Sequence, residues 1–488
     1  MTKKRGMNRR ELLKGVAAGS LATMVPWSAR AQVPNDPRFL IVLTGSGGAS
    51  IIDSMLAIKA SESANASIIN TFPDGLVQDI DNTPFRAIDR RVNGIGPLPY
   101  SGDTNQSNFV RRHAQDMMVV THTGTSVNHL VAQKRALTGN DAWAGRTLQE
   151  IIAETYGQSF PIPNVNMGAG GYIEPGVDPS ISTRSRGQIV TDARLFFAGL
   201  DGSRGIPKAP PKSVLQLART LRDTRLDEDS IFGRTFGDSK AIRLWKEQRA
   251  QITAIEQANL ITNLNVLAES PGVPLQQYGL PSSPDLARLR AVFPSLDGDP
   301  LQAQGALAYL LIKNKVSTSV TLGPGLSPLV GLTQIVDSPP LAFDFSHSSH
   351  RDTQAVMWSR LLNVADRLIG LLASEDFGDG GSFWDRSLLY VATDFGRSKN
   401  RVANSTNFGS GHHLNNGSLI VSPMCNGGRV LGGVDADTAL TYGFNPQSGQ
   451  PDQNRHMTEP EIFSGILQAM GVDTSPASLP DMPAMRRA

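Results

Sequence analysis

Two aspartates and four histidines fall in three short clusters in the last third of the chain, and their side chains are of the kinds that bind metal ions. The clusters read FDFSHSSH, ATDFGR and GSGHH, and their candidate metal ligands are Asp344, His347, His350, Asp394, His412 and His413. Carboxylate oxygens and neutral imidazole nitrogens bind zinc and the harder divalent cations. The chain has only eight His, so half of them lie in these clusters. This grouping predicts a metal site.

The elements that must position these residues alternate between strand and helix. Continuous apolar runs predict strands over 38–44, 117–122, 317–322, 387–393 and 418–422, and helical patterns predict helices over 128–137, 301–313, 350–372 and 459–470. This alternation predicts an α/β fold, a largely parallel sheet with helices on both faces. In such sheets ligands bind at the carboxyl ends of the strands. We therefore expect the metal-binding residues to share one edge of the sheet.

The segment from about 152 to 300 follows a different pattern. It holds Pro/Gly-rich loops and two longer helical stretches, over 212–222 and 239–267. We interpret it as an inserted, mostly helical and loop region, or a cap, on a single α/β domain that spans 32–488. The apolar stripe of its second helix is more typical of core packing than of a partner surface.

Three further polar groups carry open alternatives. The hydroxyls at 125 and 126 precede the predicted helix over 128–137, where backbone N–H groups can hold an anion. His129 begins that helix, so it either lines the site or is the polar end of a buried element. Arg397 either clamps an anionic oxygen with two hydrogen bonds or pairs with Asp394 and fixes its loop.

The first residues read as a twin-arginine export signal, with Asn8-Arg9-Arg10-Glu11-Leu12-Leu13-Lys14 followed by a short apolar run and Ala29-Arg30-Ala31. The run is too short to span a bilayer by itself, so we expect cleavage after Ala31, a periplasmic or secreted location, and no stable membrane anchor. The formal net charge of +2 is spread along the chain, which disfavours a nucleic-acid partner. The single cysteine, Cys425, excludes an internal disulfide.

Several motifs together resemble an exported bacterial family, the domain-of-unknown-function 1501 family. They are SLLYVATDFGRS, the Asp-x-x-His of FDFSH before a long helix, NHLVAQKRALTG after an apolar strand, the glycine turn GSGG at 45–48, and the export signal. That family is similar to the alkaline phosphatase and sulfatase superfamily. Members of that superfamily hydrolyse phosphate or sulfate esters with one or two metal ions and with a nucleophile, a hydroxyl or a modified cysteine, at the start of a helix.

The resemblance implies one metal site more completely than two. The first site of the superfamily matches Asp344, His347 or His350, and His412 or His413. The second site lacks its usual aspartate, which Ser46 or Ser50 replaces, and its usual histidine, which Phe395 replaces. We therefore expect one divalent ion, zinc, calcium, magnesium or manganese. At the nucleophile's position stands Asn128, which cannot attack. Thr125 or Ser126 just upstream either supplies the nucleophile or caps the helix.

Two functions remain from these considerations. The first is a periplasmic metal-dependent hydrolase of phosphate or sulfate esters, with a small anionic ester as substrate. The second is a catalytically degenerate relative that binds a ligand or partner in the cell envelope without turnover. In both, the twin-arginine translocase is the partner during export. A dinucleotide-binding oxidoreductase is disfavoured because the turn at 45–48 lacks the third spaced glycine.

Overall fold

The computed structural model describes residues 36–88, 105–200, 212–243, 246, 259–270, 274–275, 280–324, 342–406 and 408–487. Pro37–Ala488 form one compact unit. The predicted export signal lies outside the described residues, as do residues 244–245 and 247–258 of the predicted helix over 239–267; at the far end of that prediction the helix already ends at Asn263. Among the described residues, no helix combines the length and the apolar character that crossing a membrane requires.

An eight-stranded, mostly parallel sheet forms the centre of the described part of the chain. Its strand order is β12-β4-β11-β8-β1-β7-β5-β6. Their bounds are β1 Phe39–Gly45, β4 Met117–Thr123, β5 Asn164–Asn166, β6 Gln188–Ile189, β7 Ser319–Leu322, β8 Ser387–Thr393, β11 Asn415–Val421 and β12 Arg429–Leu431. All neighbours pair in parallel except β11, which runs antiparallel to β4 and β8.

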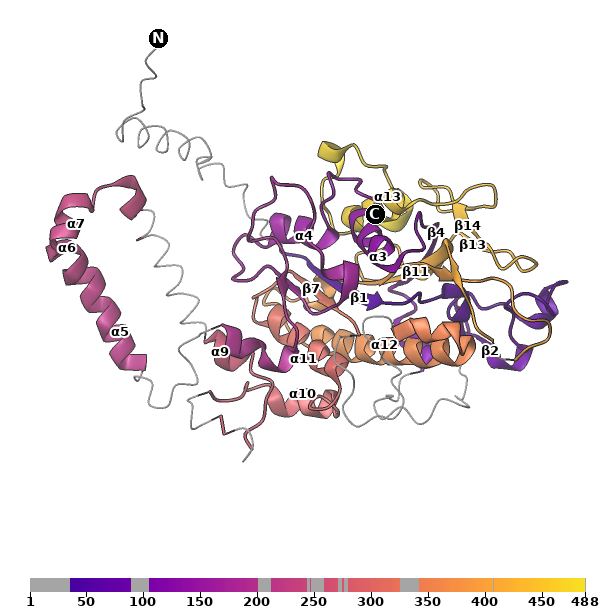
Figure 1. Ribbon diagram of the computed structural model, residues 1–488, viewed down its shortest axis with the longest axis horizontal. Coiled ribbons are helices and arrows are strands. Elements are labelled where there is room, and N and C mark those ends of the chain that lie inside the picture. The colour runs from indigo at the N-terminus through magenta and orange to yellow at the C-terminus, as the bar shows by residue number, and fades with distance from the viewer. Residues whose placement is uncertain are drawn as a thin grey trace, which may run out of the picture. The chain divides into compact units, whose positions relative to one another are not determined.

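Helices cover both faces of this sheet (Figure 1). Among the described residues the α-helices are α2 Gln106–His113, α3 His129–Thr138, α4 Leu148–Tyr156, α5 Lys212–Leu221, α6 Asp227–Asp229, α7 Ile231–Phe236, α9 Leu260–Asn263, α10 Leu286–Val292, α11 Pro300–Lys313, α12 His350–Ala373 and α13 Glu459–Ala469. Two small pairs, β2 Val77–Asp79 with β3 Arg86–Ile88 and β9 Gly396–Arg397 with β10 His412–His413, lie outside the main sheet. A third small sheet joins β13 Gly433–Val434, β14 Thr441–Phe444 and β15 Pro451–Asp452.

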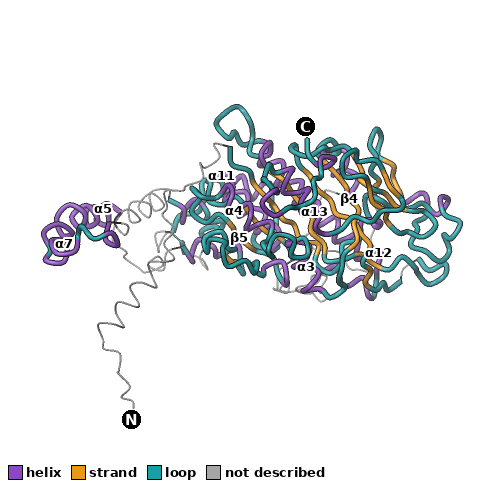
Figure 2. Tube along the Cα trace, turned by 90° about the horizontal axis from the view of Figure 1, so that it is seen from above, coloured by secondary structure: helices purple, strands orange, loops and turns teal. Residues whose placement is uncertain are grey.

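The alternation of side chains along β1 explains how one sheet builds two cores. Ile41 and Leu43 belong to the apolar cluster formed with α11 and α12, whereas Leu40 and Val42 belong to the cluster formed with α4 and α13. Successive residues of a strand point to opposite faces, so a strand that is apolar at every position must be covered on both sides. Figure 2, which looks from above, shows α3, α4 and α13 lying over the strands.

The predicted α/β class with a largely parallel sheet is confirmed, and each predicted strand and helix outside 152–300 has a counterpart within a few residues. Within 152–300 the structure adds something the pattern did not indicate. The short strands β5 and β6 extend the main sheet beyond β7, so part of that segment belongs to the sheet. The helix α5 has almost the bounds expected of it.

One edge of the sheet gathers the ends of the strands that precede the predicted site residues. Gly45, the last residue of β1, pairs with Thr393, the last residue of β8, and Thr123 at the end of β4 pairs with Asn415 at the start of β11. The segments that leave these ends carry Gly47, His129, Asp394 and His412. The topology therefore brings stretches far apart in sequence to one edge.

Candidate metal centre

Three imidazoles and one carboxylate converge at this edge. The Oδ1 atom of Asp344 lies 3.1 Å from Nε2 of His347, 3.4 Å from Nε2 of His129 and 3.7 Å from Nε2 of His412. The Nε2 atoms of His347 and His412 are 2.9 Å apart. We call these four residues the His3Asp cluster. Three of them, His129, Asp344 and His412, offer ligand atoms that all lie within 4.8 Å of one another.

Local structure explains why these side chains meet. Asp344 and His347 are three residues apart in a 3₁₀ helix, Ala342–His347, and in such a helix side chains at that spacing stand one above the other. His129 is the first residue of α3. His412 lies in β10, which pairs with β9 directly after the loop that leaves β8. The four side chains therefore come from three separate elements and meet at one place.

The ligand atoms of His129, Asp344 and His412 lie close enough together to hold a single divalent cation. Donor atoms that share a tetrahedral zinc ion at about 2.0–2.1 Å lie roughly 3.3 Å from one another, and the contacts above spread around that value. Two of the imidazoles also have an acceptor at the other ring nitrogen. His412 Nδ1 lies 3.0 Å from the carbonyl oxygen of Val127, and His129 Nδ1 lies 2.7 Å from Oδ2 of Asp394. Such partners fix the tautomer in which Nε2 presents its lone pair.

Asp394 supports the cluster from behind. Its side chain is fully buried, and its Oδ2 accepts hydrogen bonds from the backbone N–H of Gly47 at 3.1 Å and from Gln133 at 3.4 Å, besides its contact with His129. The sequence-based prediction placed Asp394 among the metal ligands and His129 among the catalytic residues. The structure places His129 in the cluster and Asp394 behind it.

Arg397 holds the cluster's carboxylate and has little capacity left for a substrate. Its buried guanidinium donates to Oδ1 of Asp344 at 3.0 Å, to the carbonyl oxygens of Phe343 at 3.2 Å and Ser410 at 3.1 Å, and to the carbonyl oxygen of Gly47. Of the two alternatives stated for Arg397, the loop-fixing role matches these contacts, although its carboxylate partner is Asp344 and not Asp394.

The charges in the cluster stabilise one another. Partial burial opposes ionisation of Asp344, but His129 and Arg397 outweigh it and hold the pKa of this carboxyl well below its usual value. Burial lowers the pKa of His129, yet Asp344 and Asp394 together raise it to about 9. Burial and the charge of Arg397 lower the pKa of His347 and of His412. The cluster thus combines an ionised carboxylate with two readily neutral imidazoles.

Two of the predicted metal ligands lie elsewhere. His350 begins α12, after the 3₁₀ helix has ended, and its ring is fully buried with Nε2 3.1 Å from Oδ2 of Asp53. His413 follows His412 in a strand, so it points to the opposite face, where its Nδ1 accepts the N–H of Asn415 at 3.1 Å. Neighbouring residues in sequence are therefore separated by local geometry.

The two candidate hydroxyls are engaged in holding the start of α3. Thr125 Oγ1 donates to Oε2 of Glu459 at 2.7 Å and accepts from Arg135 at 2.9 Å. Ser126 Oγ accepts the backbone N–H of Asn128 at 3.1 Å. Asn128 itself caps the helix, because its side chain accepts from the N–H of Val131. The alternative in which Thr125 or Ser126 caps the helix is therefore wrong, because the N-cap of α3 is Asn128.

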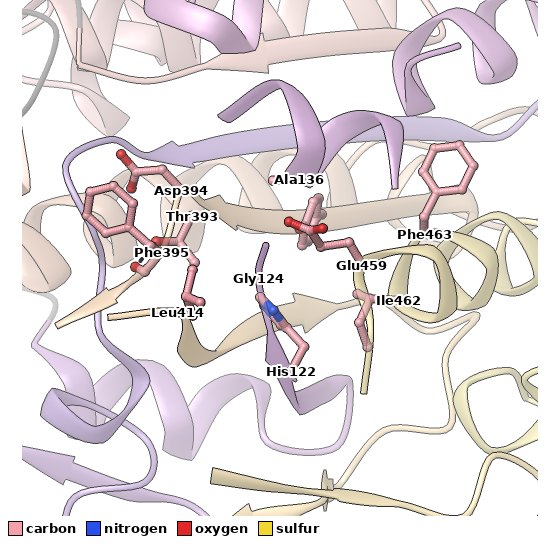
Figure 3. A pocket seen from close by; sticks show the side chains of 11 residues that line it. His122, Gly124, Ala136, Thr393, Asp394, Phe395, Leu414, Glu459, Ile462 and Phe463 are labelled. Atoms are coloured by element: carbon pink, nitrogen blue, oxygen red, sulfur yellow. Dashed lines mark hydrogen bonds between the residues drawn. The ribbon is translucent and has the colours of Figure 1, made fainter. Parts of the chain in front are cut away.

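A pocket lies beside the cluster. Asp394 and Phe395 line this pocket and also contact the cluster residues His129 and His412. Figure 3 shows His122 from β4 and Glu459 from α13 among the side chains that line it, with Asp394 at the end of β8. Burial lowers the pKa of His122 to about 4 and raises that of Glu459. Phe395 closes the side toward the cluster by stacking on His412, with ring centroids 4.1 Å apart.

Comparison with known proteins supplies no family for this chain. No family model and no curated protein matches it. Among solved structures, it is similar to one described as the crystal structure of Ps i-CgsB, at 10% identity, covering 92% of this chain and 75% of that chain, with a TM-score of 0.29. The site must therefore be interpreted from its own chemistry.

Proposed function

We propose that this chain is an exported metal-dependent hydrolase of phosphate or sulfate esters, of the alkaline phosphatase-like type and of the domain-of-unknown-function 1501 family. The observation that carries the proposal is the convergence of three imidazole Nε2 atoms on Oδ1 of Asp344. The His3Asp cluster is also open to solvent, since the side chain of His347 is 45% exposed and that of Asp344 28% exposed. A closed structural site would leave no position for a substrate.

The residues in and next to the cluster would have distinct roles in binding the ion. His129, Asp344 and His412 would hold one divalent ion, with His347 beside it; the ion would supply a Lewis acid for a phosphoryl or sulfuryl oxygen and lower the pKa of a water molecule. Asp394 orients His129 through Nδ1, and Arg397 fixes Asp344. These two supports keep the donor atoms in place before a substrate arrives, which is how preorganised sites avoid reorganisation cost.

Water is the nucleophile that suits this arrangement. The hydroxyls of Thr125 and Ser126 are both committed to other hydrogen bonds. His347 is the most exposed imidazole of the cluster, and its lowered pKa leaves it neutral at neutral pH. An exposed neutral imidazole beside the ion can accept a proton from attacking water.

A panel of esters tests the proposal directly. The full-length mature protein, loaded in turn with zinc, manganese, magnesium and calcium, is assayed on p-nitrophenyl phosphate and p-nitrophenyl sulfate. We expect turnover of one ester with one metal, reduced at least about a hundredfold in Asp344→Asn and unchanged in Asp366→Asn, which alters a carboxylate outside the cluster that pairs with Arg112 and His113. Turnover that survives in Asp344→Asn would refute the assignment.

The second candidate function, a non-catalytic envelope protein that binds a ligand or partner, has one observation in its favour. Each predicted hydroxyl is held in another hydrogen bond, Thr125 with the Glu459 carboxylate and Ser126 with the backbone N–H of Asn128. In that case the protein would bind metal and an anion, such as inorganic phosphate, without hydrolysing either ester. The same panel, with phosphate binding measured by calorimetry, distinguishes the two functions.

A further inference from the structure

The segment that carries α5, α6 and α7 has no buried side chain among its described residues. Residues 212–236 run through α5, a π-helical turn at Arg222–Leu226, α6 and, after Ser230, α7 (Figure 1). In proteins most of the stability of a helix comes from packing of its amphipathic face against another surface. We therefore expect another surface to cover part of this segment.

Both ends of the segment present apolar side chains. Val214, Leu217 and Leu221 are 52%, 59% and 43% exposed, and their spacing of three and four residues puts them on one face of α5. In α7, Phe232 and Phe236 are 58% and 52% exposed, and their ring centroids lie 5.3 Å apart. Grouped apolar side chains that are exposed mark interaction surfaces.

Between these two apolar groups the charged residues are sorted by sign. Arg219, Arg222 and Arg225 come first, and the acidic run 227–229 follows. Asp223 interrupts the basic stretch, but its carboxylate pairs with Arg222 at 2.7 Å. The order along the segment is therefore apolar, basic, acidic, apolar.

This order is complementary to itself in the antiparallel direction. When two copies of the segment lie antiparallel, α5 of each copy faces α7 of the other, and the basic stretch of each faces the acidic run of the other. A two-fold symmetric interface uses the same surface on both subunits and therefore requires such self-complementarity. Apolar burial supplies binding free energy, whereas the opposite charges fix the register.

We propose that residues 212–236 form an interface between two copies of this chain, packed antiparallel about a two-fold axis near Thr224. An anionic membrane suits the segment less well, because the acidic run 227–229 would be repelled by its surface. The proposal needs neither a metal ion nor hydrolysis, so its failure and the failure of the proposed function are separate.

Sedimentation equilibrium of the full-length mature protein tests whether this interface exists. We expect a reversible dimer. In Leu217→Ser/Leu221→Ser the dissociation constant should rise at least about a hundredfold, because four leucine side chains per dimer lose their burial. Val402→Ser is the matched control, since Val402 is 72% exposed and lies outside the segment; it should leave the dissociation constant unchanged.

An exchange of charges tests the antiparallel order. Arg219→Glu/Arg222→Glu and Glu228→Lys/Asp229→Lys should each dimerise more weakly, because like charges then face each other. An equimolar mixture of the two variants should form heterodimers about as tightly as the wild type forms its dimer. Recovery of association in the mixture would also show that both variants are folded.

Three outcomes would overturn the proposal. The first is a wild type that stays monomeric at about 100 μM, a concentration at which even weak dimers are populated. The second is a dimer that neither Leu217→Ser/Leu221→Ser nor the charge variants weaken, because its interface would then lie elsewhere. The third is a monomer that binds anionic vesicles and loses that binding in Leu217→Ser/Leu221→Ser, which would assign the segment to a membrane surface. Charge variants that fold but do not associate when mixed would contradict the antiparallel order.

Discussion

At the scale of single residues, identical side chains take different roles because of what lies next to them. His129 and His350 each contact an aspartate, yet His129 meets two carboxylates at the open edge of the sheet while the ring of His350 is wholly enclosed beside Asp53. Residue type alone therefore selects candidates, and the surroundings separate a candidate metal ligand, His129, from a buried histidine paired with an aspartate, His350.

Asp394 offers a first prediction at this scale. In Asp394→Asn the side chain keeps its shape but loses the charge that orients His129 through Nδ1, so we expect metal affinity to fall about 10- to 100-fold. Competition with a fluorescent chelator measures it. Asp366→Asn, which alters a different aspartate–histidine pair, at His113, should leave affinity unchanged. Equal losses in the two variants would contradict the supporting role of Asp394.

Lys399 offers a second, because its ammonium group is enclosed and its Nζ donates to the carbonyl oxygen of Asn415 at 2.9 Å. Burial lowers the pKa of Lys399 to about 8, against about 10.4 in an unfolded chain. Between these values the unfolded state binds more protons, so the stability of the wild type should rise with pH.

Urea unfolding of the wild type and Lys399→Met at pH 7 and pH 10 isolates this effect, since other groups titrate alike in both. We expect the wild type to gain on the order of 2–3 kcal/mol relative to the variant between the two pH values. A difference in free energy of unfolding that does not change with pH would show that Lys399 keeps its proton in the folded protein at pH 10.

At the scale of elements, the turn after β1 joins the sheet to the cluster. Gly47 has φ +93°, and a Cβ there would lie 2.4 Å from the backbone nitrogen of Asp344. The same residue donates its N–H to Asp394 and accepts from Arg397. Only glycine combines this backbone conformation with so close an approach.

We therefore expect Gly47→Ala to lower the free energy of unfolding by about 1–3 kcal/mol and to weaken metal binding, because Asp344 must shift. Gly75, where an added Cβ meets nothing within 4 Å, supplies the control Gly75→Ala. Chemical denaturation and metal titration measure the two effects. Full metal affinity in a destabilised Gly47→Ala would separate the turn from the site.

The sequence predicted those elements whose pattern is local and strong. Both β1 and β8 are apolar at nearly every position and are fully buried, and α12 is long and bounded clearly. The direction of β11 was not predictable, because strand pairing depends on the connections around it. β5 and β6, with three and two residues, are too short to produce a periodic signal.

The candidate site was predictable to the same extent. Asp344, His347 and His412 could be selected from residue type and spacing. Assigning His129 to the cluster, with Asp394 as its partner outside the cluster, required knowing that the buried carboxylate after β8 faces the first residue of α3. A histidine that opens a helix directly after a strand end was the available signal, and its partner lies 265 positions away in the sequence.

At the scale of the whole molecule, the proposed export makes a prediction that does not depend on the site. If the N-terminal motif directs twin-arginine transport, Arg9→Lys/Arg10→Lys should retain the uncleaved protein in the cytoplasm. The wild type should appear in the periplasm with Gln32 as its first residue. Fractionation and N-terminal sequencing measure both, and equal export of the two would disprove the signal assignment.

Metal binding by the cluster is the central claim, and elemental mass spectrometry of the mature protein purified from a native-like periplasm tests it most directly. We expect about one divalent ion per chain in the wild type and none in Asp344→Ala/His412→Ala. We also expect chelation to lower the melting temperature of the wild type, since an ion at a hundred times its Kd contributes about 2.7 kcal/mol to stability. Metal-free wild type, with a melting temperature unchanged by zinc, calcium, magnesium or manganese, would contradict the account.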